Sequence, residues 1–188
     1  MRPRILSIMI MIMSISLLPA MGCANQHDDN KALSKKHEKI TRQFSNVSHI
    51  SPDDFSKTQS NDIIIFDVRE RAEYDVSHIN GALHIDPNIA PERFMALYGD
   101  KAHGKTAIFY CSVGHRSSHL AKTVQASLLD HGTRAVYNLE GGIFKWHNED
   151  RPLQSNSEIR TPYIHPYNRY WGRMINDPSK LRFEVIAE

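Results

Sequence analysis

The sequence predicts an α/β fold with a central, mostly parallel sheet and helices on both of its faces. Two apolar runs, 62–66 and 105–110, are rich in β-branched and aromatic residues, as is typical of strands buried on both faces. A third such run covers 134–139. Segments with helical spacing separate these runs, and this alternation indicates parallel βαβ units.

Local signals predict the remaining elements. Ser51 followed by Pro52 is typical of a helix start, with serine as the N-cap and proline in the first turn. Glycine just after a helical segment indicates its end, as at Gly99 and Gly132. The predicted elements are strands at 47–50 and 83–85, and helices beginning at Pro52, over 70–76, over 91–98, over 117–130 and from Gly141-Gly142 through Trp146.

The first residues have the pattern of a secretory signal peptide, 1–22. Arg2 and Arg4 precede an apolar run that is too short to span a bilayer, and small residues follow it. A membrane-spanning anchor is the alternative. Ala20-Met21-Gly22-Cys23 also resembles a bacterial lipobox, in which cleavage leaves the cysteine to be acylated. We therefore expect a lipoprotein with its lipid on Cys23; a plain secreted protein is the alternative.

These features predict a location outside the cytoplasm. Ala24, rather than an aspartate, follows the cysteine, which favours a periplasmic protein anchored by lipid to the outer membrane. Residues 23–44 are polar and charged, and we expect them to form a tether between the lipid and the domain. The alternative for this stretch is a solvated helix through 35–39.

The charge balance gives no support to a nucleic-acid partner. The full chain has 23 Lys and Arg against 21 Asp and Glu, and residues 1–22 contribute Arg2 and Arg4 but no acid. After cleavage 21 residues of each sign would remain. The basic pI therefore comes partly from the signal peptide.

Cysteine usage leaves one thiol to explain. The sequence has two cysteines, Cys23 and Cys111, and acylation of the first leaves the second without a partner, which excludes a disulfide framework. Cys111 ends the strand 105–110 and precedes a polar turn and a helix. Unpaired amides and the helix dipole favour thiolate over thiol at such a point. A buried structural cysteine is the alternative.

Residues 153–188 form an aromatic and proline-rich tail in which the alternation of strands and helices is lost. We expect an irregular segment that lies on the domain and buries its aromatic side chains there. The alternative is a docking segment for a protein partner, since exposed aromatic clusters favour interfaces.

Four motifs occur in one order along the chain. They are 64–70, 78–82, 110–117 and 138–142, the last followed by Trp146. Together they resemble the single-domain rhodanese family of sulfurtransferases, and the resemblance covers 45–152. One departure is Asn80, where the family usually has proline, a change expected to affect only the turn.

The resemblance implies a rhodanese-like domain in which Cys111 is the catalytic residue and carries sulfur as a persulfide. Small sulfur compounds are the implied partners: a donor such as thiosulfate supplies the sulfur, and a thiol or cyanide accepts it. It implies no cofactor and no metal. It also implies an active loop whose amides cradle the sulfur, with helix 117–130 starting at its end. The loop residues are Ser112, Val113, Gly114, His115, Arg116 and Ser117.

Other motif residues have expected supporting roles. Arg116 is the candidate for holding an anionic donor, because its planar fork suits a sulfonate-like group; a salt bridge on the loop rim is the alternative. Asp67 and Arg69, at the neighbouring strand end, are expected to brace the loop by hydrogen bonds and an ion pair. His78 is expected to be a structural hydrogen-bonding residue, and Gly141-Gly142 to let backbone approach backbone.

Three other functions fit parts of the pattern. A dual-specificity phosphatase has a related fold but places arginine one residue later after the cysteine, and the shorter loop here suits sulfur better than phosphate. A metal site would need Cys111, His115 and His119 to converge. A non-enzymatic persulfide carrier, sensor or docking module would keep the fold without turnover.

Overall fold

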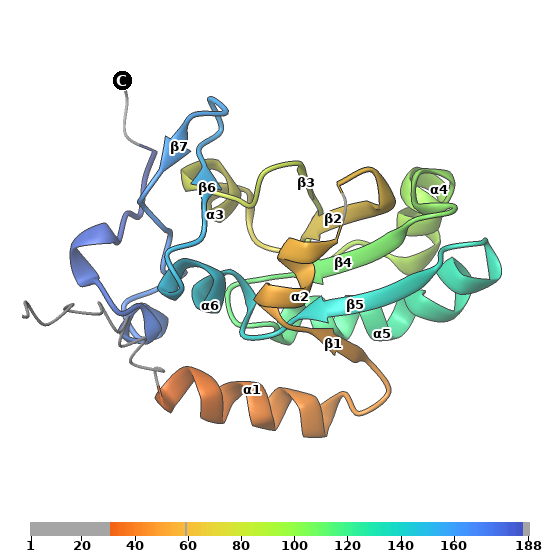
Figure 1. The fold of residues 1–188 in the computed structure, drawn as a ribbon, viewed down its shortest axis with the longest axis horizontal. Coiled ribbons are helices and arrows are strands. Elements are labelled where there is room, and N and C mark those ends of the chain that lie inside the picture. Colours follow the sequence, from red (N-terminus) through yellow and green to blue (C-terminus); the bar gives the residue numbers. More distant parts are fainter. Residues whose placement is uncertain (1–30, 59, 186–188) are drawn as a thin grey trace, which may run out of the picture.

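The computed structural model describes residues 31–58 and 60–185, and it confirms the predicted α/β fold (Figure 1). The strands of the main sheet are β1 (Ser48–Ile50), β2 (Ile63–Asp67), β3 (Ala82–His84), β4 (Thr106–Tyr110) and β5 (Ala135–Leu139). All five are parallel and are hydrogen-bonded in the order β1-β5-β4-β2-β3. The central strand is therefore β4, and its carboxyl end lies in the middle of the sheet edge.

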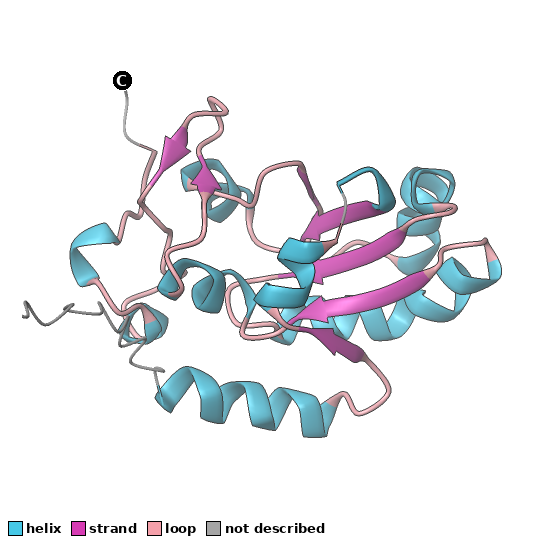
Figure 2. Ribbon diagram, viewed as in Figure 1, coloured by secondary structure: helices cyan, strands magenta, loops and turns pink. Residues whose placement is uncertain are grey.

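Helices cover both faces of the sheet. They are α1 (Lys31–Gln43), α2 (Pro52–Lys57), α3 (Arg71–Val76), α4 (Pro91–Ala102), α5 (His115–Asp130) and α6 (Gly142–Asn148), with a 3₁₀ turn η1 (Ser60–Asp62) before β2. Figure 2 shows α2 and α6 in front of the strands and α5 behind them, where α4 packs against α5. Because both faces are covered, Ile64, Ile65 and Phe66 are all buried, which explains the unbroken apolar run of β2.

Several local predictions are confirmed at the level of single hydrogen bonds. Ser51 caps α2, and its hydroxyl accepts the amide of Asp54 over 3.1 Å. Trp146 is buried against Phe55, with ring centroids 5.0 Å apart. His78 stacks on Tyr74 and bonds to its carbonyl through Nδ1 over 2.9 Å, as expected of a structural residue.

Two helix boundaries differ from the prediction. The helix expected to end at Gly99 continues to Ala102, because Gly99 is buried in the helix, where it faces His131 of the segment after α5. The turn is made instead by Gly104, with φ +71°. The second helix, α5, begins at His115 rather than at Ser117, so its first turn includes the last residues of the predicted loop.

Residues 31–43 form α1 and not the tether that the sequence predicts. Leu33 and Ile40 lie on one side of this helix and are buried, as are Phe44 and Val47 just after it. These widely spaced apolar residues join the main core, so the helix packs on the domain with one side while most of its other residues are exposed. The signal peptide and Cys23 lie outside the described residues, as does the rest of the expected tether. Within the described ranges, no helix is both long and apolar enough to cross a bilayer.

The tail is largely irregular and lies on the domain, as predicted, but its aromatic residues are at most partly buried. It contains a short antiparallel pair, β6 (Leu153–Gln154) and β7 (Arg160–Thr161), and two 3₁₀ turns, η2 (Trp171–Met174) and η3 (Pro178–Lys180). Ile164 is fully buried and Ile175 nearly so, whereas Tyr167, Tyr170 and Phe183 are 47–60% exposed. Isolated aliphatic residues, not the aromatic cluster, therefore anchor the tail.

The packing of α1 predicts a stability effect that a tether would not show. Ile40→Ala should lower the free energy of unfolding by about 2–5 kcal/mol, because it removes a side chain that is 1% exposed. Lys39→Ala, at the adjacent exposed position, should change it by less than about 0.5 kcal/mol. Urea unfolding measures both, and equal midpoints for the two variants would contradict the packed helix.

Candidate active site

Cys111 directly follows β4, at the sheet edge where ligand sites of open α/β folds lie. Only 1% of its surface is exposed. The strands β2 and β5 flank β4, so the segment after Asp67 and the turn after Leu139 lie on either side of the cysteine. Cys111 therefore lies at the end of a strand, as predicted, and this strand is the central one of the sheet.

The turn after Cys111 points a backbone amide at its sulfur. The Gly114 N–H donates a hydrogen bond to Cys111 Sγ over 3.2 Å. Gly114 has φ +96°, and a Cβ there would lie 3.0 Å from Asn138 Nδ2, so the turn requires glycine. The sixteen-residue helix α5 begins at the next residue. Unpaired amides and the helix dipole therefore stabilise negative charge on the sulfur.

A second helix N-terminus holds the carbonyl groups of the same loop. The Ile143 N–H donates to the Cys111 carbonyl over 2.9 Å, and the Phe144 N–H donates to the Ser112 carbonyl over 3.0 Å. Gly142 allows this approach at φ +60°, since a Cβ there would collide with the Cys111 carbonyl oxygen and lie 2.7 Å from that of Ser112. The predicted close approach of two backbone segments is confirmed at Gly142.

Glu73, which sequence reasoning did not select, anchors the side chains of the loop. Its buried carboxylate accepts hydrogen bonds from Ser112 Oγ at 2.7 Å and from Arg116 Nη2 at 2.9–3.0 Å. It also accepts the amide of Glu70 over 3.1 Å, as part of the capping box of α3. The glutamate three residues after this N-cap is the sequence signal that could have identified it.

Arg116 is paired inside the protein. Its Nη2 also donates to Ser112 Oγ over 2.9 Å, and its Nη1 lies 3.9 Å from Glu70. Burial acts to lower the pKa of Arg116, but the charges of Cys111 and Glu73 outweigh it and hold that pKa above its ordinary value. The salt bridge that was the alternative interpretation is present, and it involves a buried carboxylate.

Asp67 and Arg69 form the predicted ion pair but do not contact the loop directly. Arg69 Nη2 lies 2.6 Å from Asp67 Oδ2, and both side chains are fully buried. Arg69 also donates to the Ser77 carbonyl, and among the described residues neither side chain hydrogen-bonds to the loop 111–117. The pair instead fixes the end of α3, the helix that carries Glu73, so its support of the loop is indirect.

The other loop residues have different surroundings. Val113 is buried and belongs to the apolar core, while Ser117 is buried in the first turn of α5. Burial, together with the charges of Lys36, His119 and Arg116, lowers the pKa of His115. His119 is exposed, and nowhere in 31–58 or 60–185 do three metal-binding side chains cluster.

A cavity of about 280 Å³ opens over Cys111. Its floor is the loop residues 111–113 with His115 and Arg116, and its walls are Lys36 of α1 and the tail residues Tyr167 and Trp171. Figure 1 shows how the start of α1 and the tail, which are far apart in sequence, lie side by side at this end of the molecule. No pattern in the sequence predicts that these two segments meet at the cysteine.

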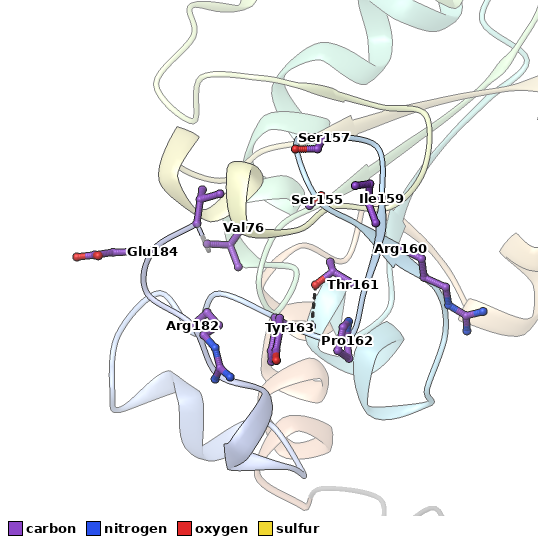
Figure 3. A pocket seen from close by; sticks show the side chains of 11 residues that line it. Val76, Ser155, Ser157, Ile159, Arg160, Thr161, Pro162, Tyr163, Arg182 and Glu184 are labelled. Carbon is purple, nitrogen blue, oxygen red and sulfur yellow. Dashed lines mark hydrogen bonds between the residues drawn. The ribbon is translucent and has the colours of Figure 1, made fainter. Parts of the chain in front are cut away.

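A second cavity, of about 210 Å³, lies within the tail (Figure 3). The segment 155–163, which includes β7, forms one side of it, and Val76 and the segment 182–185 form the rest. Arg182 lies over the ring of Tyr163 at 4.0 Å. Cys111 is not among its lining residues, so the first cavity is the candidate site.

A family model described as the rhodanese-like domain matches residues 51–149, more than half of the chain. The chain belongs to the rhodanese family. Its match leaves out α1 and the tail, which are the two segments that wall the cavity over Cys111.

Relatives of this rhodanese-family chain differ in their names and lengths. Thiosulfate sulfurtransferase GlpE of Coxiella burnetii is 32% identical over 104 residues, which cover 55% of this chain and 87% of that protein. The tRNA uridine(34) hydroxylase of Cytophaga hutchinsonii is 32% identical over 143 residues, which cover 74% of this chain but 41% of the relative. The chain thus spans less than half the length of the hydroxylases that it matches.

Two solved structures illustrate what the chain is similar to. Thiosulfate sulfurtransferase from Pseudomonas aeruginosa is 20% identical with a TM-score of 0.48, covering 67% of this chain and 23% of its own. A rhodanese-like domain protein from Staphylococcus aureus is 21% identical with a TM-score of 0.45, covering 58% of this chain and 99% of its own.

The contact between the rhodanese loop and α6 predicts that Gly142 resists substitution. Gly142→Ala should lower the free energy of unfolding by about 1–3 kcal/mol more than Gly81→Ala does. Both glycines have positive φ, but a Cβ at Gly81 would meet nothing within 4 Å, so Gly81→Ala reports backbone strain alone. Denaturant unfolding measures the difference. Equal losses would show that the loop does not need the close approach.

Proposed function

We propose that this protein is a sulfurtransferase that moves a sulfane sulfur from a donor such as thiosulfate to a thiol or cyanide through a persulfide on Cys111. One observation carries the proposal: the Gly114 N–H donates to Cys111 Sγ at the N-terminus of α5. Preorganised amides of this kind stabilise a negative sulfur without a metal or a paired cation.

Two displacements complete the reaction. The Cys111 thiolate attacks the outer sulfur of thiosulfate, a new S–S bond forms, and the S–S bond of thiosulfate breaks, its electron pair leaving with sulfite. A thiolate or cyanide then attacks the outer sulfur of the persulfide, and the electron pair returns to Cys111 as thiolate. In each step one anionic sulfur replaces another beside the loop amides. Amide donors in fixed positions can stabilise the negative charge in both forms of Cys111.

The surroundings of Cys111 support transfer between outside molecules. Cys111 is a free cysteine, and in the sequence Cys23 is the only other one. An expected lipid on Cys23 leaves no resolving thiol in the chain, which argues against a dithiol–disulfide cycle. The name of the Coxiella burnetii relative agrees with this proposal, while tRNA hydroxylation belongs to relatives of which the chain matches less than half.

Mass spectrometry tests the first half-reaction. Exposure of the purified protein to thiosulfate should add the mass of one sulfur atom at Cys111, and a thiol should remove it. Cys111→Ser should abolish the addition, because no other thiolate in the domain can attack the donor. An unmodified Cys111 after exposure to thiosulfate and other sulfane donors would refute sulfur transfer. A persulfide that no acceptor discharges would instead indicate a non-enzymatic carrier.

We further propose that the protein acts in the periplasm, held to the outer membrane by lipid on Cys23. The support is the lipobox-like Ala20-Met21-Gly22-Cys23, since residues 1–30 lie outside the described structure. In a Gram-negative host, Cys23→Ser should move the protein from the outer-membrane fraction to a soluble or inner-membrane fraction. Replacement of Asn25 by Ser serves as the control. Unchanged fractionation of the Cys23 variant would refute the anchor.

A further inference from the structure

The cavity over Cys111 contains a cation that the active loop does not neutralise. Within the described residues, Lys36 pairs with no carboxylate, and its ammonium lies 5.0 Å from the ring centroid of Trp171. Arg116, by contrast, is held by the carboxylate of Glu73. His115 adds little charge at neutral pH, because burial first and the nearby cations next lower its pKa. Lys36 is therefore the group best placed to receive an anion that enters the cavity.

The aromatic walls of the cavity are held in place by the tail. Tyr167 lies over Arg116, with the guanidinium carbon 5.0 Å from the ring centroid. Its backbone has φ +64°, a costly conformation for a tyrosine, and the Tyr167 N–H donates to His165 Nδ1 over 2.9 Å. His165 and the preceding Ile164 are buried. The tail therefore fixes this ring against the active loop at some energetic expense.

We propose that Lys36, Tyr167 and Trp171 form a donor subsite for an organic thiosulfonate anion, with its sulfonyl oxygens at Lys36 and its apolar group against the two rings. The inference rests on the proposed sulfurtransferase function and names its substrate class. The volume agrees, since about 280 Å³ is near the lower end for small-molecule sites and is several times the roughly 30 Å³ share of one water. Inorganic thiosulfate has no group that would contact the rings.

The chemistry of this donor balances in one step. The Cys111 thiolate attacks the outer sulfur of the thiosulfonate, R–SO₂–S⁻, and the new S–S bond makes the persulfide. The bond between the sulfonyl and outer sulfur atoms breaks, and its electron pair leaves with the sulfinate, R–SO₂⁻. The leaving group keeps both sulfonyl oxygens, so Lys36 can hold it throughout the transfer. Lys36 thus acts as a specificity residue and not as an acid or a base.

Donor kinetics with cyanide as acceptor test the subsite. The kcat/KM for the donor reports the first half-reaction, and it is measured with benzenethiosulfonate and with thiosulfate. Trp171→Ala should lower the ratio of the two kcat/KM values, benzenethiosulfonate over thiosulfate, about tenfold, because only the organic donor loses a contact. A change shared equally by both donors would indicate a general effect of the tail and would overturn the aromatic part of the subsite.

A lysine pair on α1 tests the anion contact. Lys36→Gln should raise the KM for benzenethiosulfonate about tenfold with little change in kcat, because a charge-assisted hydrogen bond is lost. Lys35→Gln is the matched control, since Lys35 is exposed on the same helix and lies outside the cavity. Equal KM values for these two variants would overturn the role of Lys36.

The outcomes separate this inference from the proposed function. Persulfide formation on Cys111 with an unaltered KM in the Lys36 variant and an unaltered donor preference in the Trp171 variant would leave sulfur transfer standing and refute the subsite. A parent protein that prefers thiosulfate over benzenethiosulfonate would refute the substrate class. Failure of every donor to load Cys111 would refute both.

Discussion

The active loop depends on two hydrogen bonds that α6 donates to the carbonyls of Cys111 and Ser112. Carbonyl oxygens that faced the sulfur would repel a thiolate, whereas these two are engaged by a helix N-terminus. The second N-terminus, that of α5, then meets the sulfur through Gly114. The two helix N-termini thus bind different groups. That of α6 binds the carbonyl oxygens of the loop, and that of α5 binds the negative sulfur. The close approach of α6 to these carbonyls requires glycine at position 142, where α6 begins.

Two ion pairs lie near the loop. Asp67 pairs with Arg69, and Glu73 pairs with Arg116, with three of the four side chains almost fully buried. Buried pairs of this kind cost desolvation and contribute little net stability, so their value here is in orientation. Arg116 is shared between Glu73 and Cys111, so its charge acts on the sulfur beside the amide of Gly114.

The central fold was predictable because its signals are local and dense. The strands β2 and β4 are unbroken apolar runs, and Ser51-Pro52 and Gly132 mark helix ends through single-residue chemistry. The position of Cys111 followed from the same signals. The helix α1 was not predictable in this way, because only Leu33 and Ile40 within it are buried, and a segment with three apolar residues in thirteen resembles a tether. What determines its packing is the surface on which it lies, and that surface is assembled from distant parts of the chain.

The same distinction explains why the loop was found and the cavity was not. The loop is a short stretch whose geometry its own residues and α6 determine, so sequence motifs describe it. The cavity exists only because residues before 51 and after 149 meet over Cys111, and no local pattern records that meeting. A cysteine with 1% of its surface exposed reacts only with molecules that fit between these walls. The motif therefore describes the surroundings of the sulfur, and the two outer segments form walls of the cavity above it.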